Sequence, residues 1–166
     1  TYSWKMRFFN DYAQQLEMES IGKQQNKNSL FQKTGQIVFG GFGSTAQHSY
    51  FQLLHQGTSS VCADIFTIED YKDKNKLLFD QSQAQANLLA NGDNADLKEH
   101  EKVNSNVPTN LFTLKTLNPF NLGYLIASWE HRTFMTSQML EINPFDQYGV
   151  SAGKIFTNKY LDEHGG

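Results

Sequence analysis

The apolar and polar positions along the chain follow helical spacing in several segments. Apolar side chains that recur three and four positions apart predict a helix with one buried face. Pro119 favours a helix that begins there, because proline fits the first helical position, and Gly92 favours an end just before it. Helices are therefore expected over residues 5–16, 45–56, 77–89, 118–139 and 146–161.

Three short apolar runs have the composition of buried strands, at residues 36–39, 61–68 and 110–115. Since these runs alternate with helices, we expect an α/β protein of three layers, a parallel flavodoxin-like sheet with helices on both faces. Three strands are fewer than the usual number of about 4–6 in a sheet. Either the pattern hides further short strands, or the first strand and helix lie before Thr1, with residues 1–3 as the tail of that strand.

Composition narrows the class of protein. The length of 166 residues suits one domain, and the hydrophobic fraction of 39% is low for a globular domain. A net charge of −3 without a Lys/Arg run argues against nucleic-acid binding, and no apolar run approaches the roughly 20 residues of a spanning helix. Cys62 is the single cysteine, which fits a cytoplasmic location, and its place in a strand pattern predicts burial.

Gln15 and Glu19 are the first candidates for chemistry. They are four positions apart, so on a continuous helix they share one face. Glu19 stands just before Gly22, at the expected helix end, where α/β folds bind ligands near the rim of the sheet. A carboxylate there can act as a general base, although a solvated surface acid is the commoner interpretation of such a residue.

A second candidate region runs from Gly40 to His48. A strand, a glycine-rich turn and a helix N-terminus together favour anion binding, but the stretch lacks the spacing of a P-loop or a dinucleotide-binding loop. His48 is expected one turn into that helix, near its mouth. His55 is seven residues further on, which is too far along a helix for the two to bind one metal ion.

Gln147 and Lys154 are seven residues apart and would face the same direction on one helix. The alternative interpretation is a capping glutamine and a surface lysine. No Cys/His cluster with zinc spacing and no nucleophile elbow is present in the sequence. The inventory therefore suits an acid–base reaction that uses neither a metal nor another cofactor.

The segments that hold these candidates resemble one enzyme family. They read QQLEMES at residues 14–20, GSTAQHSYFQLLHQGT at 43–58, NVPTN at 106–110, GYLIASWEHRTF at 123–134 and NPFDQYGVSAGK at 143–154. Their order and spacing resemble those of glucose-6-phosphate isomerases over most of the chain. The resemblance implies that residues 1–166 are most of the second of two sugar isomerase (SIS) domains.

The same resemblance implies roles for individual residues. Glu19 would be the base that moves a proton between C1 and C2 of the sugar through a cis-enediol. His48, which in this family comes from the partner subunit of a homodimer, and Lys154 would assist ring opening. Gln15 and Gln147 would contact the substrate, as D-glucose 6-phosphate and D-fructose 6-phosphate interconvert in glycolysis and gluconeogenesis.

The family pattern also implies parts that this sequence lacks. The family's phosphate-binding loop and an enediolate-stabilising arginine lie in the N-terminal portion, so the chain alone is expected to be nearly inactive. Ile21, Gly41, Val107 and Ser151 depart from the family's usual residues. The alternatives are a non-catalytic SIS module that binds sugar phosphates, an isomerase of a related sugar phosphate, or a small protein complete in itself.

Overall fold

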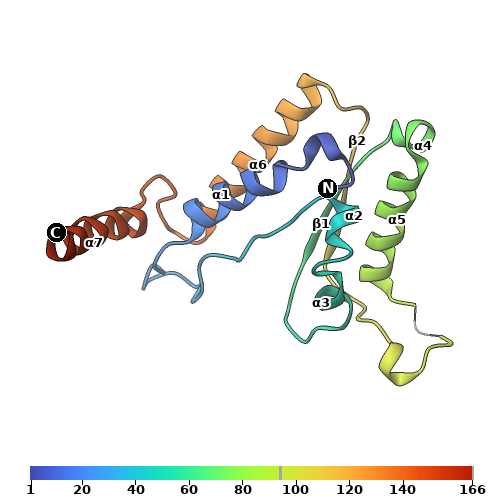
Figure 1. Cartoon of the computed structure of the whole chain (residues 1–166), viewed down its shortest axis with the longest axis horizontal. Helices are drawn as coiled ribbons and strands as arrows, with labels where there is room; N and C mark the ends of the chain where they lie inside the picture. Colours follow the sequence, from blue (N-terminus) through green and yellow to red (C-terminus); the bar gives the residue numbers. More distant parts are fainter. Residues whose placement is uncertain (94, 166) are drawn as a thin grey trace. The chain divides into compact units, whose positions relative to one another are not determined.

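The computed structural model describes residues 1–93 and 95–165 and divides into two compact units (Figure 1). The first, here called the sheet unit, comprises Thr1–Tyr12 and Phe39–Ala127. The second, the helical unit, comprises Ala13–Val38 and the residues from Ser128 onward. Helices α1 (Phe9–Ile21) and α6 (Pro119–Met139) each begin in the sheet unit and end in the helical unit.

The sheet unit contains the two strands of the described residues, and they are parallel. Strand β1 (Ala63–Ile68) pairs with β2 (Thr109–Leu114) in a register that sets Ala63 against Thr109 and Ile68 against Leu114. The expected strands at residues 61–68 and 110–115 and their parallel arrangement are thus confirmed. The other elements of this unit are η1 (Trp4–Met6), α2 (Gly43–Ala46), α3 (Phe51–Gln56), α4 (Tyr71–Lys74), α5 (Lys76–Asn91) and η2 (Glu99–Glu101).

Helices lie on both faces of this sheet, as the alternation of strands and helices predicts. Ile65 packs in a core cluster that includes Leu54 of α3 and Leu89 of α5. Phe66 points to the opposite face, because successive strand side chains alternate. There its ring contacts the ring of Phe9, in the first turn of α1, with 5.1 Å between centroids. The fold is therefore α/β in three layers.

Residues 1–3 run beside β1 and are almost completely buried. The Tyr2 amide donates to the Phe66 carbonyl at 2.7 Å, and the Thr1 carbonyl accepts from the Gly43 amide at 2.7 Å. The Tyr2 ring fills the space above Gly43, since a Cβ there would lie 2.5 Å from the ring. Only glycine at this position leaves room for the tyrosine in the core.

Two of the expected elements are wrong. Residues 36–39 form no strand: Ile37 is 84% exposed, and the Val38 carbonyl accepts from the Gln14 side chain at 2.6 Å instead of from a neighbouring strand. The helix expected over residues 45–56 is broken at residues 47–50, so that α2 and α3 are separate. The rings of Phe39 and Phe51 pack on Tyr50, whose backbone is not helical.

The remaining helices agree with the pattern, except that the helix expected over residues 5–16 begins and ends later, as α1 at Phe9–Ile21. Helix α5 ends at Gly92, whose φ of 68° suits a residue without a side chain, and the amide of Asn121 donates to the capping Asn118 at 2.8 Å in front of Pro119. Helix α7 (Tyr148–His164) replaces the one expected over residues 146–161. Cys62 was expected to be buried but is exposed, because it lies just before β1 begins.

Burial of Tyr2 makes a prediction about pH. Burial raises the pKa of its phenol to about 12, although the hydrogen bond from Gln47 opposes the shift. An unfolded tyrosine ionises near pH 10, so the stability that depends on this group is complete below about pH 10 and is lost as pH rises toward 12. Urea unfolding of the chain from pH 8 to 11.5 should show this loss, and Tyr2→Phe should reduce it. The exposed Tyr124→Phe variant is the control; if it reduces the loss equally, Tyr2 is not responsible.

Candidate active site

The helical unit is organised around the buried carboxylate of Glu17 on α1. This side chain is 3% exposed, and its Oε1 accepts from the indole of Trp129 on α6 at 2.7 Å. Its Oε2 accepts from the side chain of Gln36 and lies 4.0 Å from the guanidinium of Arg132. These contacts fix how α1 is turned about its own axis against α6.

That rotation decides where Glu19 points. Two residues along a helix correspond to a turn of about 200°, so a buried Glu17 directs Glu19 to the other side of α1. Glu19 is half-buried there, and the amide of Gln15 donates to its Oε2 at 3.3 Å. Because α1 runs on to Ile21, both residues share the helix and the face that their spacing predicts.

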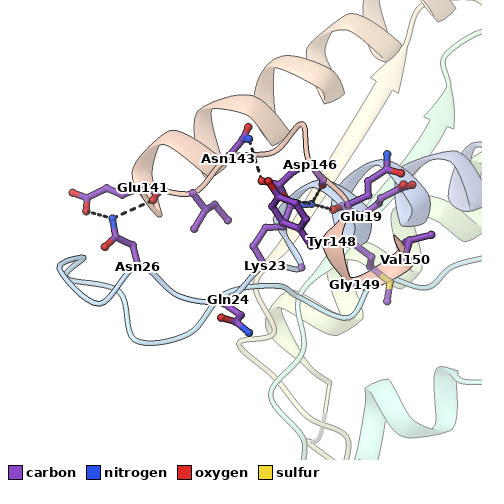
Figure 2. Close-up of a pocket in the computed structure, with 14 residues that line it drawn as sticks. Glu19, Lys23, Gln24, Asn26, Glu141, Asn143, Asp146, Tyr148, Gly149 and Val150 are labelled. Carbon is purple, nitrogen blue, oxygen red and sulfur yellow. Dashed lines mark hydrogen bonds and ion pairs between the residues drawn. The ribbon is translucent and has the colours of Figure 1, made fainter. Parts of the chain in front are cut away.

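Glu19 lines two adjoining hollows in the helical unit, with volumes of about 670 and 680 Å³. Both volumes are in the range of small-molecule sites. The two hollows share Met18, Glu19, Gln147 and Val150. The first is also lined by Gly22, Lys23, Gln24, Asn26, Glu141, Ile142, Asn143, Asp146, Tyr148 and Gly149 (Figure 2), and the second by Gln14, Gln15 and Lys154.

The far wall of the first hollow is formed where α6 ends. Glu141 has a φ of 56°, and its amide donates to Gln138 at 3.1 Å while the amide of Ile142 donates to Ser137 at 3.0 Å. This is a Schellman motif, in which glycine usually takes the left-handed place. Asn26 donates to the carbonyl and the carboxylate of Glu141 at 3.3 and 3.4 Å. A strained end of α6 is thus tied to the loop that follows α1.

The segment between α6 and α7 carries its own hydrogen bonds. The Asn143 side chain accepts from the Phe145 amide at 3.1 Å and donates to the Asp146 carboxylate at 3.0 Å. Gln147 follows as the N-cap residue of α7, and its carbonyl accepts from the Ser151 amide at 3.0 Å. Lys154 lies in the second turn of that helix. A turn stabilised by its own side chains therefore presents Gln147 to the hollow.

Four of the five predicted site residues come together in this unit, from its two separate stretches of chain: Gln15, Glu19, Gln147 and Lys154. His48 belongs to the sheet unit. It was expected one turn into a helix but lies in the turn between α2 and α3, where its amide donates to Thr45 at 3.1 Å. His55 is on α3 and pairs with the Gln85 side chain at 3.0 Å, so the two histidines do not share a helix face.

Several amides of the glycine-rich turn, where the pattern favours anion binding, are used within the protein. The amide of Gly43 donates to the carbonyl of Thr1, and the amides of Thr45 and Ala46 both donate to the carbonyl of Phe42. Helix α2 has only four residues. The amides of Gly43, Thr45 and Ala46 are therefore occupied by the protein's own carbonyls.

The four departures from the family pattern have different surroundings. Val107 is buried in the core cluster of the sheet unit, and Ile21 is 3% exposed at the end of α1. The Gly41 carbonyl accepts from the amino group of Thr1 at 2.9 Å, whereas Ser151 is exposed on α7. The apolar residues at 21 and 107 thus contribute to packing.

Sequence reasoning missed the residues that join the walls of the hollow, above all Lys23, Glu141 and Asp146. Their only sequence signal is proximity to the predicted helix ends. Chemically, the first hollow combines carboxylates, which can transfer protons, with amides suited to sugar or other hydroxyl groups. Within residues 1–93 and 95–165, no three His, Cys, Asp or Glu side chains are grouped to hold a metal ion. In the same ranges no helix is long and apolar enough to cross a membrane.

Comparisons with known proteins agree on one family. The family described as phosphoglucose isomerase matches residues 1–165. The chain is 38% identical to a glucose-6-phosphate isomerase of Acinetobacter venetianus, covering 96% of the chain and 33% of the relative. It is also 38% identical to glucose-6-phosphate isomerase 2 of Neisseria meningitidis, covering 98% of the chain and 34% of the relative. The chain thus spans about a third of the length of these relatives.

Solved structures give the same result. The crystal structure of a glucose-6-phosphate isomerase from Chlamydia trachomatis superposes with a TM-score of 0.85 at 30% identity, over 97% of this chain and 33% of that one. A protein from Thermus thermophilus, described as hypothetical, has a TM-score of 0.73 at 23% identity, over 96% of this chain and 40% of that one. The second likeness concerns the fold alone.

The buried carboxylate gives a prediction about stability. Glu17→Ala removes the buried carboxylate that accepts from the indole N–H of Trp129 and faces Arg132, which should lower the free energy of unfolding by about 3 kcal/mol. Glu163→Ala is the control, because that carboxylate forms an exposed ion pair with Lys159 and should cost less than about 1 kcal/mol. Urea unfolding followed by Trp fluorescence measures both. Equal effects of the two variants would contradict the role given to Glu17.

Proposed function

The chain belongs to the phosphoglucose isomerase family, and from that premise we propose that it is the C-terminal, second SIS domain of a glucose-6-phosphate isomerase. The complete enzyme interconverts D-glucose 6-phosphate and D-fructose 6-phosphate, a step of glycolysis and gluconeogenesis in the cytoplasm. One observation carries the proposal above all: Glu19, Gln15, Gln147 and Lys154 line two hollows that share a wall.

Glu19 is the base in this proposal. Aldose–ketose isomerisation moves a proton between C1 and C2, and a single carboxylate can remove it from one carbon and return it to the other by way of a cis-enediol. Glu19 suits this role because it is half-buried and is oriented by Gln15, whose amide reaches Oε2 at 3.3 Å. Such a reaction requires neither a metal nor a redox cofactor.

The other residues bind and open the sugar ring. Gln147 offers an amide at the wall shared by both hollows, where hydroxyl groups can be bound. Lys154 supplies a positive charge near the ring oxygen, and His48, contributed by the partner subunit of a homodimer, assists proton transfer during ring opening. Each role follows from the match between these positions and the family pattern.

The remaining requirements lie outside the chain. A sugar phosphate is a dianion near neutral pH, whereas the first hollow contains three carboxylates, those of Glu19, Glu141 and Asp146. The phosphate therefore binds elsewhere, to the N-terminal portion, which also supplies the arginine that stabilises the enediolate. In this proposal the chain functions only as part of the complete polypeptide, a protein about three times as long.

The base assignment can be tested directly in the complete polypeptide. Glu19→Gln keeps the size of the side chain but removes its basicity, so turnover should fall by about 10²–10⁴-fold. Exchange of the C2 proton of glucose 6-phosphate with deuterium oxide should fall with it, while binding of the sugar phosphate remains. Glu163→Gln on exposed α7 serves as the control. Exchange at the wild-type rate in Glu19→Gln would exclude Glu19 as the base, and a wild type that binds without exchange would favour the non-catalytic module.

The dependence on the missing portion is a separate prediction. The 166-residue chain alone should convert fructose 6-phosphate at a rate at least about a hundredfold below that of the complete polypeptide, because it lacks the charge stabilisation and the remote binding energy. A coupled dehydrogenase assay compares the two at equal concentration. Addition of the separately expressed N-terminal portion should restore part of the activity. Near-normal turnover by the chain alone would refute this division of labour.

A further inference from the structure

Lys23 occupies a central place in the helical unit that the proposed mechanism leaves unexplained. It stands two residues after α1, and its side chain is only 14% exposed. Its ammonium donates to the Glu19 carbonyl at 2.5 Å and to the Asp146 carbonyl, and it lies 3.7 Å from the Asp146 carboxylate (Figure 2). One side chain thus joins the helix of the base to the segment that precedes Gln147.

These contacts engage most of the hydrogen-bonding capacity of Lys23 within the protein itself. An ammonium group has three N–H donors; here it donates to the carbonyls of Glu19 and Asp146, and the Asp146 carboxylate, 3.7 Å away, supplies the opposite charge. A substrate hydroxyl that approached this ammonium would compete with these oxygens at a largely buried position. The side chain is therefore arranged to hold protein segments together.

The end of α1 and the segment before Gln147 each contain an oxygen atom that the Lys23 ammonium stabilises. The last carbonyls of a helix have no partner within it, and the Glu19 carbonyl is one of these, because the amide of Lys23 donates to Ile21 at 2.7 Å instead. On the other side, Asp146 is held by Asn143 and immediately precedes Gln147. The ammonium satisfies the carbonyl of the base's own residue and neutralises a carboxylate beside the substrate-binding amide.

The backbone of Lys23 is itself held by its neighbours, which makes the connection stiff. The backbone carbonyl of Lys23 accepts a hydrogen bond from the hydroxyl of Thr34. Next to it, Gly35 packs closely on Gly22, since a Cβ added at Gly35 would lie 3.1 Å from the Cα of Gly22. A displacement of Asp146 relative to Glu19 would have to stretch a group anchored at both ends.

We propose that Lys23 is a positioning residue of the isomerase reaction, which keeps Glu19, Gln147 and the start of α7 at the separation that proton transfer requires. This inference rests on the proposed function. A shift of about 1 Å in a catalytic group can reduce a rate by about a hundredfold, whereas binding of the phosphate elsewhere is insensitive to it. Loss of Lys23 should therefore lower kcat much more than it changes KM.

The test uses Lys23→Met in the complete polypeptide, with kcat and KM measured on protein whose thermal unfolding shows that it is folded. We expect kcat to fall by about 10- to 100-fold with KM within about threefold of the wild type. Lys159→Met is the matched control, since that lysine also pairs with a carboxylate in the helical unit but is exposed. A wild-type kcat in folded Lys23→Met would overturn the proposal, as would an effect confined to stability.

A second variant covers the case in which Lys23→Met does not fold. Asp146→Asn keeps the carbonyl acceptor but removes the ion pair, and it should lower kcat by about 3- to 10-fold with little change in KM. In the double variant the two effects should not add, because both remove the same connection. An unchanged kcat in Asp146→Asn, or full additivity, would refute the connection.

Glu19→Gln in the same assay separates the two proposals. If it retains wild-type exchange, the proposed function fails. If only the Lys23 and Asp146 variants are normal, the positioning role alone fails.

Discussion

The carboxylate of Glu17 must find its hydrogen bonds inside the protein, and the helical unit is arranged to supply them. A buried, unpartnered carboxylate is very unfavourable, so α1 can adopt only the rotation that brings Glu17 to the indole of Trp129 and the guanidinium of Arg132. The direction of Glu19, two residues on, follows from that rotation. A constraint on burial thus determines where the proposed base is presented.

The candidate site combines stretches that are far apart along the sequence. Glu19 lies in the last turn of α1, while Gln147 is the N-cap residue of α7, and both strands of the parallel sheet lie between them in the chain. Such contacts form only after a long loop has closed, at an entropic cost that local interactions cannot offset. Besides Glu17 and Trp129, Lys23 and Asn26 join the two stretches through hydrogen bonds, to Asp146 and Glu141. The site therefore depends on contacts that have little strength until the whole unit has formed.

The sequence predicts the elements whose cause is local. The cap formed by Asn118 and Pro119, the strands before and after α5 and the shared face of Gln15 and Glu19 all follow from residues near one another in the chain. Residues 36–39 show the limit, because an apolar run carries no information about whether a neighbouring strand exists to pair with it. The break at Tyr50 depends on rings that include distant Phe39, and the ammonium of Lys23 reaches an oxygen 123 positions away. Neither contact has a period or spacing that could reveal it.

Helix α7 is exposed along its whole length, including Ile155, Phe156 and Tyr160. Isolated helices shorter than about 12–15 residues are only marginally stable in water, and α7, with 17 residues, is only slightly longer. Little free energy is therefore needed to unfold it. Covering the apolar side of α7 would therefore stabilise the helix, so the two processes are thermodynamically coupled. The position of the Lys154 ammonium therefore depends on how completely α7 is ordered, so the local concentration of the group that we propose for ring opening varies with the coverage of this helix.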